Sequence, residues 1–464
     1  MERQTVEEYL DFLRFSLNEG AAVPESVKLI DWDQLLQFAK DQCVPGVYWM
    51  GVRRLGHLKE NKPTDDHVMR WMAACGKLGK RNSTVTERSA WVAKNFEKEG
   101  FRACLLKGQG LALCYPDPSL RYPGDIDIWV RPDRRSRSSN ATASRSNGSS
   151  SALQGSRGSF STKAAKPSAS AASQRSNNPS DVQGSNAATQ RSRGSFSTKA
   201  AKPSANAATQ RSNATASRSS HSSFHFSLFT HREDADIRTV IAYCRQFVPD
   251  AKACYHHIDF LKAGDVPVEV HYRPSWLNNP FHNRRLQQYF LEHADAQFSN
   301  LQPQGFATPT WEFNVVFLLS HIANHLLHEG IGLKQVIDYY YLLRSQTERR
   351  SIESYEQEFR CLGLLPFARQ LMWVLCQVLG LDEQLLVARQ DERRGRLLLS
   401  EMLAGGNFGM HDDRPLSGFY SSGLKSNLQR VVRDLRMMRY FPSESLWEPA
   451  FRIWHYFWRR RHRS

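Results

Sequence analysis

Hydrophobic residues recur along most of this chain at intervals of three or four positions. In residues 1–98, Tyr9 and Leu13 are spaced in this way, and so are Leu35 and Ala39. Spacing of this kind places apolar side chains on one face of an α-helix, so it predicts a helical N-terminal region. From residue 310 onward the same spacing predicts helices at 311–327, 333–343, 355–362, 366–379 and 383–403.

The central part of the chain has a different pattern, in which short apolar runs end at glycine, proline or charged residues. Runs at 101–106 and 125–130 predict two β-strands. Residues 257–262 and 267–273 flank a glycine-containing turn and predict a β-hairpin. A helix is predicted at 234–247, so this part of the chain combines strands with helices.

The second of these strands carries two aspartates that bear on function. Successive side chains of a strand point to opposite faces, so Asp125 and Asp127 share one face. Ile126, Ile128 and Val130 share the other face. Two carboxylates this close repel each other, and a hard divalent cation with oxygen ligands would neutralise them. The alternative is a pair of solvated aspartates at the edge or end of a strand.

Two neighbouring segments add candidate groups to the aspartate pair. Lys107-Gly108-Gln109-Gly110 follows the first apolar run and opens a segment of helical character. A strand, a glycine turn and a helix start can present backbone N–H groups to an anion, but the same residues also form ordinary turns. In the hairpin, Glu269 and His271 alternate with Val268 and Val270. Glu269 therefore offers a third carboxylate from a neighbouring strand.

A glycine turn suited to an anion, an Asp-x-Asp strand and a further acidic strand together resemble the DNA polymerase β-type nucleotidyltransferases. The chain is most similar to a poorly characterised bacterial branch of that superfamily, which has Lys-Gly where Gly-Ser is usual, so that no hydroxyl follows the glycine. The residues that carry the resemblance are Lys107, Gly108, Tyr115, Arg121, Asp125, Asp127, Glu269, His271, His321, His325, Asp338 and Gly405-Gly-Asn407-Phe-Gly409. Their order covers nearly the whole chain outside one insert.

The resemblance implies an α+β fold, in which a small mixed-sheet nucleotidyltransferase core is flanked by N-terminal and C-terminal helical regions and interrupted by a disordered insert. The expected boundaries are a helical region at 1–98, a core at 99–132 and 224–300, an insert at 133–223 and a helical C-terminal domain at 301–464. In template-independent nucleotidyltransferases such a C-terminal bundle commonly helps to hold the base or the acceptor.

The implied reaction moves a nucleoside monophosphate from a nucleoside triphosphate (NTP) to an acceptor hydroxyl. Asp125, Asp127 and Glu269 would bind Mg²⁺ or Mn²⁺ and carry catalysis, with Glu269 either on the ion nearest the hydroxyl or acting as a base. The residues expected to contact the nucleotide are Lys107, Gly108, Arg121 and His271. Arg121 would offset the carboxylates or clamp phosphate.

Two questions about the reaction stay open at this point. The acceptor is a protein, an RNA, a sugar or a small molecule, and the sequence does not choose between them. The competing class of function is a binding or regulatory protein that keeps the fold without catalysis, either antitoxin-like or an accessory of a biosynthetic gene cluster.

The segment 133–223 differs from the rest of the chain because it is rich in Ser, Ala, Asn and Gln. It contains a repeat, because the sequence of residues 157–169 recurs at residues 193–205 with a period of 36. With few apolar residues to pack, it is predicted to be disordered. Its function stays open between a repeat expansion without a role, a basic tether for RNA and a phosphorylation-controlled arm.

The formal net charge of +16 comes mostly from this insert, and the C-terminal run 459–463 carries four further arginines. No basic face is therefore predicted for the folded part, although the insert and the arginine run are candidate contacts for nucleic acid. No apolar run reaches the roughly eighteen residues of a membrane span. The N-terminus lacks the pattern of a secretory signal, and eight scattered cysteines without a Cys-x-x-Cys pair are typical of buried free thiols. A cytoplasmic location is expected.

Three features near the C-terminus are open to more than one interpretation. His321, His325 and His328 share a helical face at a spacing that suits a transition metal. No cysteine or obvious acidic ligand nearby completes the set, so donation to a buried acceptor such as Asp338, or contact with substrate, is favoured. The glycine-rich motif Gly405-Gly-Asn407-Phe-Gly409 is either a helix cap or a cleft loop. The aromatic residues of 447–458 are expected to pack between helices, with phosphate or an acidic lipid surface as the alternative.

Overall fold

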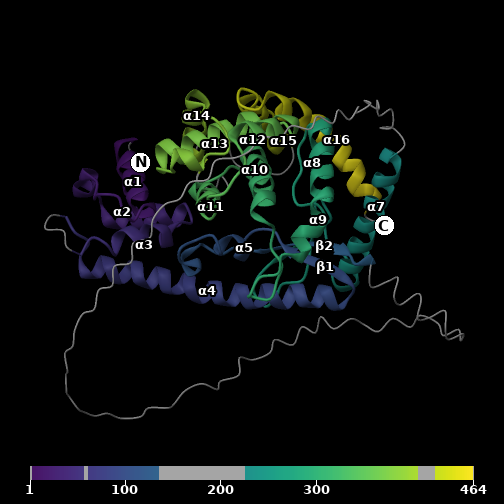
Figure 1. Ribbon diagram of the computed structural model, residues 1–464, viewed down its shortest axis with the longest axis horizontal. Helices are drawn as coiled ribbons and strands as arrows, with labels where there is room; N and C mark the ends of the chain where they lie inside the picture. The colour runs from purple at the N-terminus through teal and green to yellow at the C-terminus, as the bar shows by residue number, and fades with distance from the viewer. Residues whose placement is uncertain (1–2, 57–60, 135–224, 406–423, 463–464) are drawn as a thin grey trace, which may run out of the picture. The chain divides into compact units, whose positions relative to one another are not determined.

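The computed structural model describes residues 3–56, 61–134, 225–405 and 424–462 (Figure 1). The chain divides into two compact units, Met1–Phe160 with Arg232–Ser464, and Ser161–His231. Nearly all of the second unit lies outside the described residues. So do the predicted disordered insert, apart from Asp133 and Arg134, and the glycine-rich motif after Gly405.

The N-terminal part of the chain is helical, as the apolar spacing predicts. Its elements are α1 (Arg3–Leu17), η1 (Glu25–Leu29), α2 (Trp32–Asp41), α3 (Pro45–Val52) and α4 (Asp65–Lys98). Thr64 begins α4 with a reciprocal cap, because its hydroxyl accepts the N–H of His67 while the His67 ring accepts the N–H of Thr64. This helix is long enough to contact α2 and α3 near its start and the sheet near its end (Figure 1).

A four-stranded mixed sheet follows α4 and confirms the predicted strands and hairpin. Its strands are β1 (Phe101–Leu105), β2 (Ile126–Pro132), β3 (His257–Asp259) and β4 (Val268–His271), in the order β1-β2-β4-β3. β1 runs antiparallel to β2 and β3 antiparallel to β4, whereas β2 and β4 run parallel. In that parallel pair Asp127 lies beside Glu269, and Trp129 lies beside His271. The register therefore brings the acidic residues of two distant segments side by side.

Shorter elements and further helices connect the strands and follow the sheet. They are α5 (Gln109–Ala112), η2 (Pro118–Leu120), α7 (His225–Phe247), α8 (Pro280–Glu292) and α9 (Ala294–Ser299). The C-terminal elements are α10 (Trp311–His328), α11 (Leu333–Arg344), α12 (Ile352–Cys361), α13 (Leu365–Trp373), η3 (Val374–Val378), η4 (Glu383–Leu385), α14 (Glu392–Gly405), α15 (Leu424–Met437) and α16 (Pro442–Arg461).

The two faces of β2 belong to different hydrophobic cores. Ile126, Ile128 and Val130 pack in a core that also contains Phe96 of α4 and residues of α7. Trp129, on the opposite face, belongs to a larger core built by the N-terminal and C-terminal helices. The alternation of apolar and polar positions predicted this separation, and it leaves Asp127 on the face that looks toward the C-terminal helices.

The N-terminal and C-terminal helices share that larger core. Arg14 of α1 donates a hydrogen bond to the carbonyl of Val378, and Arg344 of α11 donates one to the carbonyl of Leu17.

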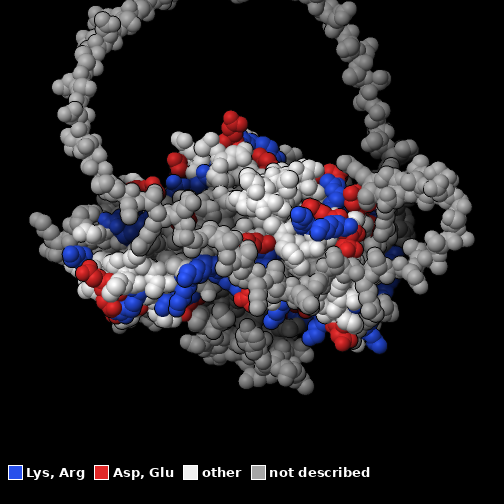
Figure 2. Space-filling model, turned by 90° about the horizontal axis from the view of Figure 1, so that it is seen from below, with Lys and Arg blue, Asp and Glu red and all other residues white. Residues whose placement is uncertain are grey.

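No helix among the described residues combines the length and the apolar character that a membrane span needs. On the face shown in Figure 2, basic and acidic side chains are interspersed over the described surface.

One predicted helix is wrong over its first half. Residues 383–403 were expected to form a single helix, but η4 ends at Leu385 and α14 begins only at Glu392. Within this interval the backbone N–H of Arg389 donates to the carboxylate of Glu356 on α12 at 3.0 Å and so is not available for an intrahelical hydrogen bond.

Glu356 also predicts a pH-dependent contribution to stability. Hydrogen bonds from Arg369, which outweigh the opposing effect of burial, lower the pKa of Glu356 to about 2. A carboxylate with a lowered pKa stabilises the fold above its unfolded pKa of roughly 4.3, and this stabilisation is lost as the pH falls toward the folded value. We expect Glu356→Gln to reduce the free energy of unfolding by about 1–3 kcal/mol at pH 7 and by much less at pH 3, measured by urea titration.

Glu353→Gln is the matched control, because Glu353 pairs with Arg389 but is 68% exposed. Its effect should stay within about 1 kcal/mol at both pH values. An equal effect of Glu356→Gln at pH 7 and pH 3 would contradict the assignment.

Candidate active site

Asp125, Asp127 and Glu269 converge where β2 and β4 pair. One oxygen of each carboxylate lies within 4.8 Å of an oxygen of each of the others. Asp127 is 1% exposed, whereas Asp125 and Glu269 are partly exposed. The Oδ2 atom of Asp127 is buried and has no protein hydrogen-bond partner. Oxygen atoms at this separation suit a hard divalent cation.

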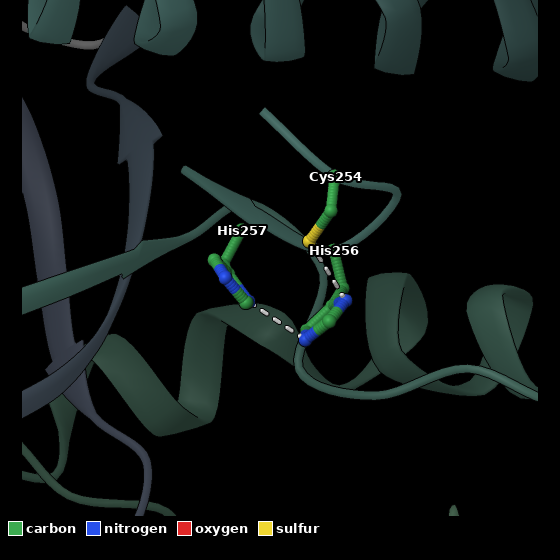
Figure 3. Close-up of side chains that lie close together, drawn as sticks. All are labelled: Cys254, His256 and His257. Atoms are coloured by element: carbon green, nitrogen blue, oxygen red, sulfur yellow. Dashed lines mark hydrogen bonds between the residues drawn. The ribbon is translucent and has the colours of Figure 1, made fainter. Parts of the chain in front are cut away.

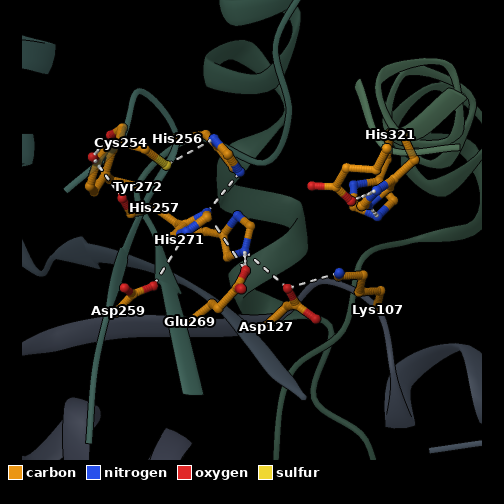
Figure 4. A network of polar contacts seen from close by, with 12 residues as sticks. Lys107, Asp127, Cys254, His256, His257, Asp259, Glu269, His271, Tyr272 and His321 are labelled. Carbon is orange, nitrogen blue, oxygen red and sulfur yellow. Dashed lines mark hydrogen bonds and ion pairs between the residues drawn. The ribbon is translucent and has the colours of Figure 1, made fainter. Parts of the chain in front are cut away.

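Two basic side chains neutralise the carboxylates in this structure (Figure 4). The Nζ atom of Lys107 lies 3.0 Å from Oδ1 of Asp127, and Nε2 of His271 lies 3.1 Å from the same oxygen. The same His271 nitrogen is 3.5 Å from Oε2 of Glu269. Asp127 and Glu269 thus share one imidazole.

The pKa values of these groups follow from burial and charge. Burial alone would lower the pKa of Lys107, but the charges of Asp127, Asp125 and Glu269 raise it. Burial would also lower the pKa of His271, yet its hydrogen bonds to Asp127 and Glu269 raise it. Conversely, burial would raise the pKa of Asp127, and Lys107 and His271 lower it. These shifts favour the ionised form of Asp127 and the protonated forms of Lys107 and His271.

The Lys107-Gly108 turn follows β1 and lies next to the aspartates. Gly108 has a φ of +63°, a conformation that favours glycine, and a Cβ at this position would lie 3.4 Å from the carbonyl oxygen of Asp125. The helix that follows, α5, has only four residues, because Pro116 and Pro118 come soon after it. So short a helix contributes little dipole, and Lys107 is the main positive group of the turn.

Arg121 lies in a separate buried ion pair. It is 3% exposed, and its Nε and Nη2 atoms each lie 2.8 Å from a carboxylate oxygen of Asp338 on α11. The hydroxyl of Tyr115 donates to the same carboxylate at 2.7 Å. Asp338 therefore accepts from Arg121 and Tyr115 and not, as the sequence suggested, from the histidines of α10.

The histidines of α10 form a chain of contacts among themselves. His321 and His325 are joined by their Nε2 atoms at 3.0 Å, and Nδ1 of His325 lies 2.7 Å from Oε2 of Glu329. His328 binds the carbonyl of Asn324 through Nδ1. Among the described residues, no cluster of three metal-type ligands includes any of them.

His321 of α10 lies near enough to Lys107 and His271 for their charges to act on it, and it is labelled with them in Figure 4. Burial, together with the charges of His325, Lys107 and His271, lowers its pKa well below the usual value.

Sequence reasoning missed several residues near this site. Lys334 of α11 is one, because a Cβ at Gly124 would lie 3.8 Å from its Nζ atom. Burial and the charge of Arg121 lower the pKa of Lys334 to about 8. Cys254, His256 and His257 are the others, and their closeness in sequence was a signal that could have been used. Lys334 had no such signal, since it is remote in sequence from the loop that it approaches.

Comparison with known proteins identifies the family. A profile of a family described as uncharacterised nucleotidyltransferases matches residues 28–142 and 229–380, which include every site residue named above. The unmatched interval between the two parts falls almost entirely within the insert predicted at 133–223. Neither curated proteins nor solved structures gave a significant match. Because the profile covers more than half of the 464 residues, the protein belongs to this family of uncharacterised nucleotidyltransferases.

Proposed function

We propose that this protein is a divalent-metal-dependent nucleotidyltransferase that moves a nucleoside monophosphate from an NTP to an acceptor hydroxyl. The observation that carries the proposal is the convergence of Asp125, Asp127 and Glu269 in a member of a nucleotidyltransferase family. The order of the Lys-Gly turn, the Asp-Ile-Asp strand and the Glu-x-His strand supports a place in the DNA polymerase β-type superfamily.

The three carboxylates fit a hard cation such as Mg²⁺ or Mn²⁺. All three offer oxygen, and Oδ2 of Asp127 lacks a protein partner although it is buried. Asp125, Asp127 and Glu269 would hold the ion. When bound, it would neutralise phosphate charge and lower the pKa of the attacking hydroxyl.

The protein's own residues have separable roles in this proposal. The acceptor oxygen forms a bond to the α-phosphorus, the bond to the bridging oxygen breaks, pyrophosphate leaves, and the hydroxyl proton passes to Glu269 or to water. Lys107 now contacts Asp127, and neutralisation of that carboxylate would free its ammonium for phosphate oxygens. His271 positions Asp127 and Glu269 through one nitrogen. Arg121 is engaged with Asp338, so we assign it to holding the loop before Asp125.

The test measures NTP binding and turnover together. Calorimetric titration of the full chain with each NTP is expected to give one site whose affinity falls at least tenfold when EDTA replaces Mg²⁺. Incubation with Mg²⁺ and a panel of protein, RNA, sugar and small-molecule acceptors is expected to release pyrophosphate with one of them.

Two outcomes would count against the proposal. NTP binding that is absent, or that is indifferent to Mg²⁺, would reject the metal-dependent site. Mg²⁺-dependent binding without pyrophosphate release across the whole panel would favour a binding or regulatory protein that keeps the fold.

A further inference from the structure

A second cluster of ligand-type side chains lies beside the carboxylates and has no role in the proposed transfer reaction. Cys254, His256 and His257 occupy the start of β3 and the turn that precedes it (Figure 3). The Sγ atom of Cys254 is 3.4 Å from Nδ1 of His256, and Nε2 of His256 is 2.8 Å from Nδ1 of His257. One donor atom of each residue lies within 4.8 Å of those of the other two.

The backbone holds these side chains together before any ligand arrives. The N–H of Cys254 donates to the carbonyl of His257 at 2.9 Å, and Ala253 and Ile258 form an antiparallel bridge just outside them. These contacts close a tight turn that folds Cys254 back toward His257. The hydroxyl of Tyr272 donates to the carbonyl of His257 at 3.0 Å and ties the turn to the residue that follows β4.

Each imidazole is also fixed from its far side. The ring of His256 stacks on Trp276, with centroids 4.0 Å apart and planes at 27°. The Nε2 atom of His257 lies 3.7 Å from a carboxylate oxygen of Asp259, which leaves Nδ1 to face the cluster. A carboxylate behind a histidine is the usual arrangement where that histidine binds a metal, because it fixes the ring and raises its basicity.

Cys254 would bind a metal ion as the thiolate, and His256 and His257 would bind it as neutral imidazoles. Cys254, His256 and His257 are each only partly buried, so an ion can reach them from solvent.

We propose that Cys254, His256 and His257 bind a zinc ion. One thiolate and two imidazoles form a donor set that suits Zn²⁺ and disfavours Mg²⁺, which prefers oxygen. Bond lengths of about 2.3 Å to sulfur and 2.0–2.1 Å to nitrogen place tetrahedral donors about 3.3–3.6 Å apart. Each imidazole would bind the ion through one nitrogen, and one donor atom of each of the three residues already lies within 4.8 Å of the others, so rotation of the side chains toward a common point completes the geometry.

The zinc site would adjoin the carboxylate site without replacing it. Oε2 of Glu269 lies 3.6 Å from Nδ1 of His257 and is a candidate fourth ligand. The polar contacts continue from His257 through Glu269 and His271 to Asp127 and Lys107 (Figure 4). An ion on His257 would therefore fix β3 beside the strand that carries Glu269.

Cobalt substitution tests this proposal without nucleotide, so its result is independent of the transfer reaction. The full chain, stripped with a chelator and dialysed, is titrated with Co²⁺. We expect one Co²⁺ ion per chain to give the intense visible bands of a tetrahedral complex and a near-ultraviolet thiolate-to-cobalt band, and Zn²⁺ to displace it. An ion on the oxygen ligands of the carboxylate site would give no thiolate band. Cys254→Ser should abolish the thiolate band, while Cys361→Ser, at an exposed cysteine on α12, should keep it.

Loss of a residue that only hydrogen-bonds to a zinc ligand lowers zinc affinity by about 10–100-fold. Cys254→Ser removes a ligand itself, so its zinc affinity should fall by more than that. Absence of the thiolate band in the wild type, or its persistence in Cys254→Ser, would overturn the proposal.

A labelling experiment on the wild type covers the case in which Cys254→Ser does not fold. Iodoacetamide alkylation is followed at each cysteine by mass spectrometry, with and without one equivalent of Zn²⁺. Zinc should slow the alkylation of Cys254 at least tenfold and leave that of Cys361 unchanged. Equal labelling of Cys254 in both samples would also overturn the proposal.

Discussion

Replacement of Asp127 by Asn is expected to lower the rate of Mg²⁺-dependent nucleotidyl transfer by about 10²–10³-fold or more. The substitution keeps the shape of the side chain but removes one of three charges that would hold the ion. Asp127 is also the carboxylate that contacts both Lys107 and His271, so its charge orders the basic groups of the site. Pyrophosphate release, measured under conditions in which the wild type turns over, gives the rate.

Asp265→Asn is the matched control for this substitution. Asp265 lies in the turn between β3 and β4, is 73% exposed and pairs with Arg81 of α4. Its loss should leave turnover within about twofold, because an exposed pair contributes little to the fold and Asp265 lies outside the carboxylate cluster. Circular dichroism and an unchanged urea midpoint establish that each variant is folded.

Asp125→Asn should have an effect similar to that of Asp127→Asn, and it serves as a second variant because Asp125 is less buried. Turnover that survives both substitutions with the same dependence on Mg²⁺ concentration would reject the assigned site. Loss of turnover with intact Mg²⁺-dependent NTP binding would limit the role of the aspartates to the chemical step.

The part of the site that follows from local pattern was predictable from the sequence. The alternation of Asp125 and Asp127 with three apolar residues fixes which face each side chain takes, because a strand has a period of two. The hairpin was equally local, since Glu269 and His271 needed only the turn before them. The helices outside the core followed from apolar spacing, except where Glu356 withdraws a backbone N–H from the expected helix.

The contacts between distant segments were not predictable in the same way. Asp127 and Glu269 become neighbours only because β2 and β4 pair in parallel across the insert. Arg121 was expected near phosphate because its charge suits that role, but Asp338, 217 residues away in sequence, accepts from its Nε and Nη2 atoms. Local sequence gives the chemistry of a side chain, while its partner depends on the tertiary fold.

The buried ion pair with Asp338 bears on the role of Arg121. A phosphate that bound Nε or Nη2 of this guanidinium would displace Asp338 and leave a buried carboxylate with Tyr115 as its donor. The backbone carbonyl of Arg121 accepts from Asn82 of α4 at 2.8 Å, so the loop before Asp125 is held from two sides. These contacts favour a structural role in placing Asp125 over direct contact with nucleotide.

Asp338→Asn is accordingly expected to reduce the free energy of unfolding by about 3–5 kcal/mol. Arg121 and the Asp338 side chain are 3% and 8% exposed, so the substitution leaves a buried guanidinium without its counter-charge. Desolvation opposes the charge on Arg121, but Asp338 raises the pKa of the guanidinium and keeps it protonated. Urea titration, followed by both circular dichroism and tryptophan fluorescence, measures the change and tests whether the two transitions coincide.

Two further variants separate the loss of a partner from a general effect of losing a carboxylate. Glu392→Gln removes a carboxylate from an ion pair with Arg396 in which both side chains are more than 60% exposed, and should cost no more than about 0.5 kcal/mol. The double variant Arg121→Met with Asp338→Leu removes both buried charges and should regain most of the stability that Asp338→Asn loses. If Asp338→Asn unfolds at the wild-type urea concentration, Arg121 does not depend on Asp338, and the guanidinium returns as a candidate phosphate ligand.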